Sequence, residues 1–240
     1  MKYRLPNNEE KPVYVEQMFD KIAKKYDLFN EIVTFGMHNK WKRFAASQIE
    51  LRSEQNCIDL CCGTGDIARE VLRQYPSSKV TGLDFSEEML NIAESKNTNM
   101  IKVKYIQGDA MDVPFQDENF NAVTIGYGMR NVQNINKFLQ EILRVLKPEG
   151  ILVSLDVGKI RNPILAKLNN FYFFHIVPFV GKLLMSGENI FKYLPESSIE
   201  YPSQESLKNL MIKNGFQNVK FYNFVFGAST VHVAYKPAKS

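Results

Sequence analysis

Short apolar runs alternate along this chain with segments in which apolar residues recur every three or four positions. The clearest segment is INKFLQEILRVLK (135–147), where apolar residues at 138, 139, 142, 143 and 146 predict an amphipathic helix. Strands are predicted at 57–62, 79–85, 102–110, 120–128 and 151–158, and further helices at 66–75, 86–96 and 203–216. Because strands and helices alternate, we expect an α/β fold with a mostly parallel sheet and helices on both faces.

The C-terminal pattern adds antiparallel character to one edge of this sheet. VKFYNF (219–224) and STVHVAYK (229–236) alternate as a closing hairpin, which makes seven strands. Two segments fall outside the alternation: a helical segment at about 10–50 and an insert at about 159–202. We expect both to cover the carboxyl ends of the strands, where such sheets bind ligands, within one domain spanning 1–240.

Two local features predict where helices begin and end. Ser86 is placed to cap the helix that follows it, because its hydroxyl can accept a hydrogen bond from a free backbone N–H group. The PEG sequence at 148–150 predicts that the preceding helix stops and that the chain turns before its next strand.

Composition and charge narrow the classes of protein. The 240 residues are 23% charged with a net charge of +4, which is ordinary for a soluble protein. We expect no nucleic-acid partner, since no dense run of arginine and lysine is present, while weak attraction to anionic lipid stays open. The chain has no uninterrupted apolar run near the ~20 residues of a membrane span, and MKYRLPNNEE lacks the apolar core of a signal peptide.

The cysteines and histidines point to a reducing compartment without a metal site. All three cysteines lie within 57–62, and nothing else in the chain can complete an even set of disulfides. We therefore expect free thiols and a cytoplasmic location. His38, His175 and His232 are scattered and no C-x-x-C pair is present, so we expect no metal and structural roles for these histidines.

A glycine turn in NCIDLCCGTGDIAREVL (56–72) joins the first strand to its helix. Gly63, Gly65 and Ala68 match the G-x-G-x-x-A spacing of dinucleotide-binding proteins, in which backbone N–H groups approach a phosphate. Asp66 follows the turn directly, and its negative charge disfavours a diphosphate there. A plain tight turn between strand and helix remains an alternative.

Three acids accompany this turn. Asp59 lies inside the first strand, Asp84 ends the second, 21 residues after Gly63, and Asp109 ends the third. A carboxylate at Asp84 can accept hydrogen bonds from two ribose hydroxyls, and one at Asp109 from an adenine amino group. The expected pocket is acidic, which suits S-adenosylmethionine with its sulfonium and ammonium groups. For any one aspartate, a helix cap is the alternative interpretation.

At this point the chain resembles a known family. DLCCGTGD and GLDFSEEML are similar to the cofactor motifs of class I S-adenosylmethionine-dependent methyltransferases, which have a Rossmann-like fold. The closer resemblance is to the quinone-biosynthesis C-methyltransferases, which act on demethylmenaquinone and polyprenyl benzoquinols. It is carried by four further stretches: MFDKIAKKYDLFNEIVTFGMHNKWKR (18–43), GDAMDVPFQDENFNAVTIGYGMRNV (108–132), RVLKPEG (144–150) and FKYLPESSIEYP (191–202).

The resemblance runs from about residue 15 to the end and is weakest at 159–190. Glu149 replaces the usual glycine of KPGG, and LDVGKI (155–160) is expected to lack the acid and the serine often found there. Neither departure touches the cofactor motifs, although the second bears on which quinol fits.

The resemblance implies a set of cofactor-binding positions. Thr64 would lie beside the methionine portion, Asp84 would hold the ribose, Asp109 and Ala110 would frame the adenine, and Gly126 would line the cofactor after the fourth strand. The full implied set is Gly63, Thr64, Gly65, Asp84, Phe85, Asp109, Ala110 and Gly126.

The resemblance also implies catalytic positions at Arg130, Asn131 and Tyr26. A ring carbon of the electron-rich quinol attacks the S-methyl group, and a base, directly or through water, then removes the ring proton. We expect Arg130 to stabilise the phenolate, since a guanidinium stays protonated, and Asn131 and Tyr26 to support it. The structural alternatives are a surface salt bridge to the following helix for Arg130, a helix cap for Asn131 and a core position for Tyr26.

The predicted function is therefore C-methylation of a prenylated quinol, with demethylmenaquinol preferred. A methoxy-polyprenyl benzoquinol and a phytylated naphthoquinol stay open as substrates. A dehydrogenase, a cofactor-binding scaffold and a nucleic-acid methyltransferase are weaker alternatives. The resemblance implies a homodimer. The aromatic insert (Phe171, Tyr172, Phe173, Phe174 and Phe179) suggests core packing, a groove for the prenyl tail or contact with the inner face of a membrane.

Overall fold

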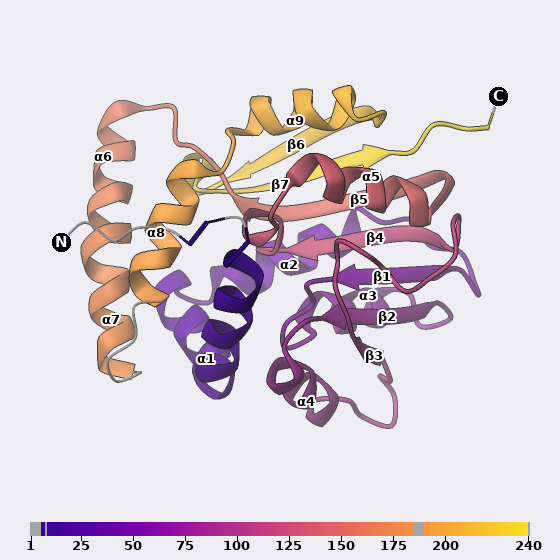
Figure 1. Ribbon diagram of the computed structural model, residues 1–240, viewed down its shortest axis with the longest axis horizontal. Helices are drawn as coiled ribbons and strands as arrows, with labels where there is room; N and C mark the ends of the chain where they lie inside the picture. The colour runs from indigo at the N-terminus through magenta and orange to yellow at the C-terminus, as the bar shows by residue number, and fades with distance from the viewer. Residues whose placement is uncertain (1–5, 8, 185–189, 240) are drawn as a thin grey trace.

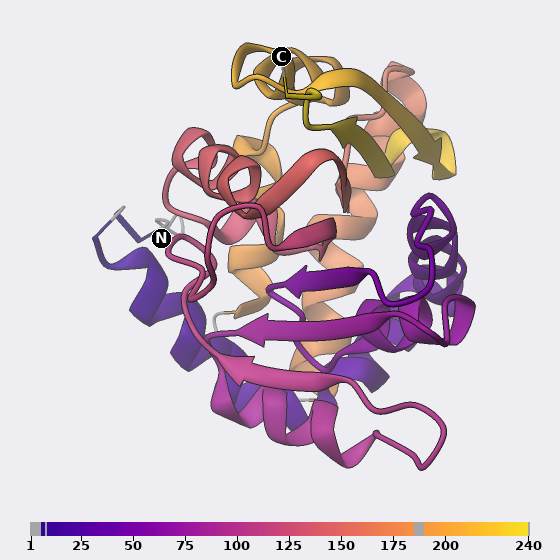
Figure 2. The same ribbon diagram turned by 90° about the vertical axis from the view of Figure 1, so that its right-hand side faces the viewer.

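The computed structural model describes residues 6–7, 9–184 and 190–239, which form a seven-stranded sheet with the order β3-β2-β1-β4-β5-β7-β6. Strands β1 to β5 are parallel, and β7 is antiparallel to both β5 and β6. The predicted architecture is confirmed, and the yellow C-terminal hairpin lies at the opposite edge from β3 (Figure 2). The strands are β1 (Asn56–Leu60), β2 (Lys79–Asp84), β3 (Lys104–Gln107), β4 (Phe120–Gly126), β5 (Leu146–Val157), β6 (Gln217–Phe224) and β7 (Ser229–Tyr235).

Helices cover both faces of the sheet, which is why its central strands are nearly continuous apolar runs. On one face, α2 (Met37–Ser47), α3 (Asp66–Gln74) and α4 (Glu87–Ser95) contribute to the core. On the other, α5 (Ile135–Val145) and α9 (Gln204–Lys213) do the same.

The predicted apolar face of α5 is the face that packs. Phe138, Leu139 and Ile142 are fully buried in the core. The predicted cap of α4 is also confirmed, because the Ser86 Oγ accepts a hydrogen bond from the backbone N–H of Met89 at 3.1 Å. The periodic pattern of the sequence therefore predicted which residues these helices bury.

The prediction at the PEG sequence was wrong. β5 begins at Leu146, directly after α5, and not at residue 151. Phe120 of β4 pairs with Leu146 and Ala122 pairs with Ile151, so residues 147–150 bulge out of the ladder. Glu149 takes a left-handed backbone conformation with φ +62° in this bulge. The sequence that looks like a turn between two elements is an interruption within one strand.

Four helices lie beyond the carboxyl ends of the parallel strands (Figure 1). They are α1 (Lys11–Thr34), α6 (Pro163–Phe171), α7 (Val177–Leu184) and α8 (Ile190–Glu200). A π-helical turn at Tyr172–Ile176 joins α6 to α7. The segments expected to cover the site are thus helical where they are described, while residues 185–189 of the insert lie outside the described residues.

A separate core cluster holds α1, α7 and α8 together. Met18, Ile22 and Phe29 of α1 are buried with Val177 of α7 and Tyr193 of α8. The cluster continues onto the sheet through Met89 of α4, and the Tyr172 hydroxyl donates to the Val33 carbonyl at 2.8 Å. The covering layer is therefore packed and hydrogen-bonded to the rest of the protein.

Candidate active site

Three adjoining cavities lie at the carboxyl ends of the parallel strands. We name them by their position and lining. The strand-end cavity, about 840 Å³ with its open part, lies over β2, β3 and β4. The turn cavity, about 360 Å³, lies over the glycine turn after β1. The apolar cavity, about 1570 Å³, lies between α1, α2 and the insert. Tyr26 and Tyr127 line all three, so the cavities meet beside these two side chains.

Asp84 is the central acceptor of the strand-end cavity. One carboxylate oxygen accepts the Gly63 N–H at 2.7 Å, and the other accepts the Ser86 N–H at 3.0 Å. Burial raises the pKa of Asp84, and these backbone donors oppose that rise. Each carboxylate oxygen has two lone pairs, so each can accept one more hydrogen bond. Asp84 can therefore bind a vicinal diol such as a ribose.

Beyond Asp84 the lining of the same cavity becomes mostly apolar. Leu83, Phe85, Ala110 and Met111 line it, together with Asp109. The Asp109 carboxylate accepts the Met111 N–H at 2.7 Å, which fixes its orientation. An aromatic base fits this combination of apolar walls and one hydrogen-bond acceptor. The predicted residues Asp84, Phe85, Asp109 and Ala110 are thus brought together at one wall.

The glycines of the turn serve different purposes. Gly63 has φ +53° and lines both the strand-end and the turn cavity. Gly65 has φ +76° and lines none of the three cavities. It faces Tyr105 instead, and a Cβ on it would lie 2.2 Å from the Tyr105 hydroxyl. Gly126 does line the strand-end cavity, and a Cβ on it would lie 2.4 Å from Cδ1 of Ile67. The left-handed backbone and the packing against Tyr105 therefore account for Gly65.

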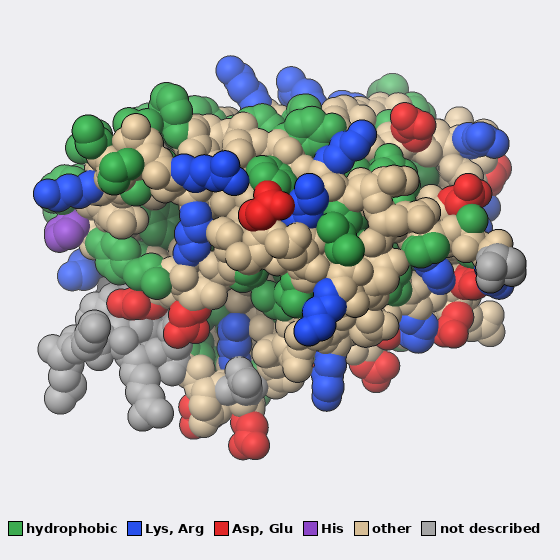
Figure 3. All heavy atoms as spheres, turned by 90° about the horizontal axis from the view of Figure 1, so that it is seen from above, with side chains coloured by type: hydrophobic (Ala, Val, Ile, Leu, Met, Phe, Trp, Pro, Cys, Tyr) green, Lys and Arg blue, Asp and Glu red, His purple; other side chains and the backbone are tan. Residues whose placement is uncertain are grey.

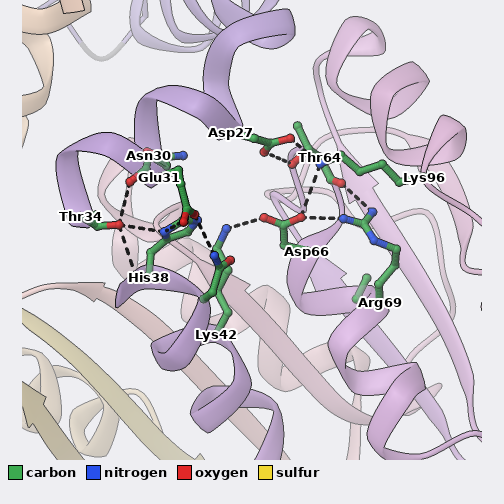
Figure 4. Close-up of polar contacts among 12 residues, drawn as sticks. Asp27, Asn30, Glu31, Thr34, His38, Lys42, Thr64, Asp66, Arg69 and Lys96 are labelled. Carbon is green, nitrogen blue, oxygen red and sulfur yellow. Dashed lines mark hydrogen bonds and ion pairs between the residues drawn. The ribbon is translucent and has the colours of Figure 1, made fainter. Parts of the chain in front are cut away.

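Ionic contacts surround the start of α3 (Figure 4). Asp66 pairs with Lys42 and with Arg69, each at 2.6 Å, and with Lys96 at 3.5 Å. Burial opposes ionisation of Asp66, but Lys42 and the other cations outweigh it and lower its pKa to about 2. The expectation that the negative charge of Asp66 disfavours an anion beside the turn is wrong, because this charge is compensated by Lys42, Arg69 and Lys96.

The same network reaches α1. The Thr64 hydroxyl, which is buried, donates to Asp27 at 2.7 Å, and Asp27 also pairs with Lys96 of α4 (Figure 4). Thr64 lines the turn cavity, where the methionine portion was expected. Its hydroxyl is thus already engaged with the covering helix.

Asp59 lies at the bottom of the turn cavity and is almost fully buried. Its carboxylate accepts the Thr124 hydroxyl at 2.7 Å and the Ala68 N–H at 3.1 Å. Burial raises the pKa of Asp59 to about 7, and the hydrogen bond from Thr124 opposes the rise. The carboxyl group therefore changes charge near neutral pH.

Arg130 is buried and does not form a surface salt bridge to the following helix. Its guanidinium pairs with Asp156 of β5 at 2.6 Å, and its backbone N–H reaches the same carboxylate at 3.3 Å. Asp156 thus supplies a carboxylate in the stretch 155–160, so the departure from the family pattern noted there does not remove the acid. Arg130 lines the apolar cavity, and its buried Nε has no hydrogen-bond partner among the described residues.

Asn131 and Tyr26 both border the cavities. The Asn131 amide nitrogen donates to the Tyr127 carbonyl at 3.3 Å, and its oxygen accepts the Tyr193 hydroxyl at 3.0 Å. Asn131 is not the cap of the next helix, since that role belongs to Asn134. Tyr26 lines all three cavities, so it is more than a core position.

Sequence reasoning missed Tyr127, Asp156 and Lys42. Tyr127 has φ +58°, a rare conformation for a bulky residue, and its ring lies 5.5 Å from the Arg130 guanidinium. Tyr127 lies inside the family stretch GYGMRNV, so this stretch could have identified it as a site residue. Asp156 and Lys42 are far from the glycine turn in sequence, and only the fold brings them there, although Lys42 lies within the family stretch 18–43.

The fold is that of the class I S-adenosylmethionine-dependent methyltransferases. It resembles an S-adenosylmethionine-dependent methyltransferase from Thermotoga maritima with a TM-score of 0.67 at 20% identity, covering 92% of this chain and 99% of that one. Residues 6–236 match the model of the ubiE/COQ5 methyltransferase family, and the chain belongs to that family.

Two relatives refine this assignment. A demethylmenaquinone methyltransferase of Leptospira interrogans is 44% identical over 244 residues, covering 99% of this chain and 98% of that one. A demethylmenaquinone methyltransferase of Staphylococcus aureus is 36% identical over 233 residues, covering 97% of both. The family and the fold together make this protein an S-adenosylmethionine-dependent methyltransferase.

Within the described part of the chain, no helix combines the length and apolar character needed to cross a bilayer. The same residues contain no group of three or more His, Cys, Asp or Glu side chains placed to hold a metal ion.

Proposed function

We propose that this enzyme methylates a ring carbon of demethylmenaquinol. The observation that carries the proposal is the meeting of the strand-end cavity, the polar turn cavity and the large apolar cavity at Tyr26 and Tyr127. A cofactor and an apolar ring would each have a cavity of their own and would touch where these cavities join. The names of the full-length relatives support the naphthoquinol as the ring.

The residues of the strand-end cavity fit the cofactor. Asp84 would accept the two ribose hydroxyls, while Asp109 and the apolar wall at Ala110 would hold the adenine. Gly63 would lie along the methionine portion, toward the turn cavity. S-adenosylmethionine supplies an electrophilic methyl group. The protein contributes by holding sulfur, methyl and ring carbon in line.

Arg130 is placed to stabilise the quinol in its reactive form. Arg130 lines the apolar cavity, and its guanidinium can donate to a quinol oxygen as that oxygen gains negative charge. The Asp156 carboxylate holds the guanidinium in place, and Asn131 is held by Tyr193. The ring carbon forms a bond to the methyl group while the methyl–sulfur bond breaks, and water takes the ring proton. Arg130 is not the base, because a guanidinium stays protonated.

The exposed apolar surface suggests how a prenylated quinol reaches the apolar cavity. Phe35, Leu168 and Phe226 line this cavity, and they are 78%, 62% and 75% exposed. They form the rim of the cavity. A stripe on α6 and α7 continues from the rim with Ile164, Phe171, Phe179 and Leu183. Figure 3 shows hydrophobic side chains gathered, with basic ones among them, at the α6–α7 end of the molecule.

We therefore propose that the rim and the stripe touch the bilayer that holds the substrate, at its cytoplasmic face. Exposed apolar side chains of this kind can contact the prenyl tail of the substrate, and they can also insert into a lipid surface. Cys57, Cys61 and Cys62 are free thiols, which agrees with a reducing compartment. On this proposal the chain works as one domain, with 10–50 and 159–202 covering the substrate. The homodimer stays a prediction, which light scattering after size exclusion can check.

The test is to incubate the protein with methyl-labelled S-adenosylmethionine and a reduced, short-tailed demethylmenaquinone. Label recovered on the naphthoquinol ring is the expected result. A parallel incubation with a reduced methoxy-polyprenyl benzoquinone is the substrate control. Label on the benzoquinol alone would contradict the proposed substrate while leaving the enzyme class intact.

A further inference from the structure

The methionine end of the cofactor carries an α-carboxylate, and the strand-end cavity offers it no positive partner. The charged side chains that line this cavity are Glu16, Asp84 and Asp109, all of them acids. A carboxylate placed among them would be repelled and would lack a charged donor. The positive partner of the α-carboxylate must therefore lie in the adjoining turn cavity.

In the turn cavity, Lys42 is the one basic side chain among the described lining residues. It comes from α2, far from the cofactor motifs in sequence, and its side chain is 12% exposed. The turn cavity shares Gly63 and Gly126 with the strand-end cavity, so a ligand can extend from one into the other.

Lys42 has hydrogen-bonding capacity to spare. An ammonium group has three N–H donors, and Asp66 accepts one of them at 2.6 Å. The described residues supply no hydrogen-bond acceptor for the other two. Figure 4 shows the side chain reaching from α2 toward Asp66 at the start of α3. The remaining donors can serve a ligand in the turn cavity.

The charge of the surrounding network favours an anion. Three cations, Lys42, Arg69 and Lys96, face two carboxylates, Asp27 and Asp66 (Figure 4). The amino end of α3 adds the positive end of a helix dipole at the same place. One added carboxylate would balance this excess. The α-ammonium of the same ligand would have Asp59, which lines this cavity too.

We propose that Lys42 binds the α-carboxylate of the cofactor and so fixes the methionine portion. Lys42 then anchors the methionine end of the cofactor and Asp84 its ribose, with the sulfur between them where the three cavities meet. The inference rests on the proposed placement of the cofactor and adds a ligand that lies outside the glycine motif.

The test compares S-adenosylhomocysteine with its decarboxylated analogue by titration calorimetry, so that no turnover is needed. The wild-type protein should bind S-adenosylhomocysteine at least about ten-fold more tightly than the analogue. In Lys42→Met this preference should fall to near one. The matched control is Lys96→Met, which removes another cation from Asp66 but lies outside the turn cavity and should keep the preference.

The possible outcomes separate the two proposals. If Lys42→Met keeps the wild-type preference, or if the wild type shows none, Lys42 does not bind the carboxylate. If the wild type binds neither compound, the placement of the cofactor itself is wrong. Lys42→Arg, which retains the charge, should retain the preference. If Lys42→Met does not fold, Lys42→Gln replaces it in the comparison with Lys96→Met; it keeps a donor but no charge, and it should lose most of the preference.

Discussion

At the scale of single residues, Asp59 and Asp66 show how surroundings set a charge. The two carboxylates are seven positions apart and both line the turn cavity. Burial raises the pKa of Asp59 to about 7, because hydrogen bonds from Thr124 and Ala68 and the more distant charge of Lys42 oppose it only in part. Burial beside Lys42 leaves the pKa of Asp66 lowered to about 2. Near neutral pH, Asp66 is a fixed charge and Asp59 is one that can be gained or lost.

Asp59 should make folding less favourable as pH rises. Its pKa in the folded protein, about 7, lies above the ordinary value of 3.8, so its contribution is complete below about pH 4 and is lost as pH rises through 7. At roughly 1.4 kcal/mol per pKa unit, the free energy of unfolding should fall by up to about 4 kcal/mol over this interval. In Asp59→Asn this loss should be absent. Urea unfolding at pH 5 and pH 8 measures the part of it that falls in this window, about two pKa units or roughly 3 kcal/mol.

The variant must be compared with the wild type, because the pKa of Asp84 is also raised and Asp84 therefore also lowers the stability of the protein as pH rises. The introduced amide could keep both contacts, since its oxygen can accept from the Ala68 N–H and its nitrogen can donate to the Thr124 hydroxyl. Equal pH dependence in the two proteins would contradict the assignment of the titration to Asp59.

Arg130→Ala should reduce the rate of methyl transfer by about 100-fold or more, the usual loss for removal of a group that stabilises a developing anion. Affinity for S-adenosylhomocysteine should stay near the wild-type value, because Arg130 lines the apolar cavity and not the strand-end cavity. Single-turnover rates and calorimetric binding measure the two separately.

Arg130→Ala also leaves the buried Asp156 without its ion-pair partner, and this second effect must be controlled. Removing one member of a buried ion pair costs about 3–5 kcal/mol of stability, so thermal unfolding should be followed in parallel. Asp156→Asn weakens the same pair while leaving Arg130 in place. If Arg130→Ala turned over at the wild-type rate at saturating quinol, the stabilising role would be excluded.

At the scale of elements, the site depends on how closely β4 approaches α3. Gly126 ends β4 and faces the Ile67 side chain, with no room for a Cβ between them. The two elements come this close where the strand-end and turn cavities join. The packing of a helix against a strand thus sets the width of the site.

Gly126→Ala should destabilise the protein by about 1–3 kcal/mol through overpacking against Cδ1 of Ile67. Ile67→Val removes that methyl group, so the double variant should recover part of the loss. Urea unfolding of the four proteins gives the coupling energy between the two positions. Strictly additive effects would show that the contact with Ile67 is not the reason why Gly126 must lack a side chain.

How far the sequence predicts this protein also differs among its elements. Periodicity identified Phe138, Leu139 and Ile142 as core, because helix spacing and burial follow one local rule. The bulge at 147–150 was missed, because strand pairing with β4 overrides the local turn preference. Lys42 and Asp156 could not be predicted, since only tertiary packing brings α2 and β5 to the motif residues.

At the scale of the whole molecule, apolar side chains gather where the apolar cavity opens. The rim of Phe35, Leu168 and Phe226 comes from three separate parts of the chain. The stripe on α6 and α7 extends the same surface. The remaining surface carries single exposed apolar residues such as Met100, in the loop between α4 and β3.

Flotation with vesicles tests whether the rim binds lipid. The wild-type protein should float with vesicles of phosphatidylglycerol and phosphatidylethanolamine, because the rim and stripe can bury apolar area in the interface. Replacing Phe35, Leu168 and Phe226 by serine should leave most of the protein in the soluble fraction. Met100→Ser removes one apolar side chain that is 93% exposed, away from the rim, and should float like the wild type. A triple variant that floats unchanged would exclude the rim as the contact.

The position of β7 bears on how this enzyme is made. β7 lies between β5 and β6, although both precede it in the chain. Until residues 229–235 leave the ribosome, β5 keeps an open edge, and an open apolar edge readily pairs with other chains. Asp156, which holds Arg130, stands opposite Thr230 in that final pairing. A nascent chain therefore needs shielding, by a chaperone or by fast closure, up to the moment at which its active site is completed.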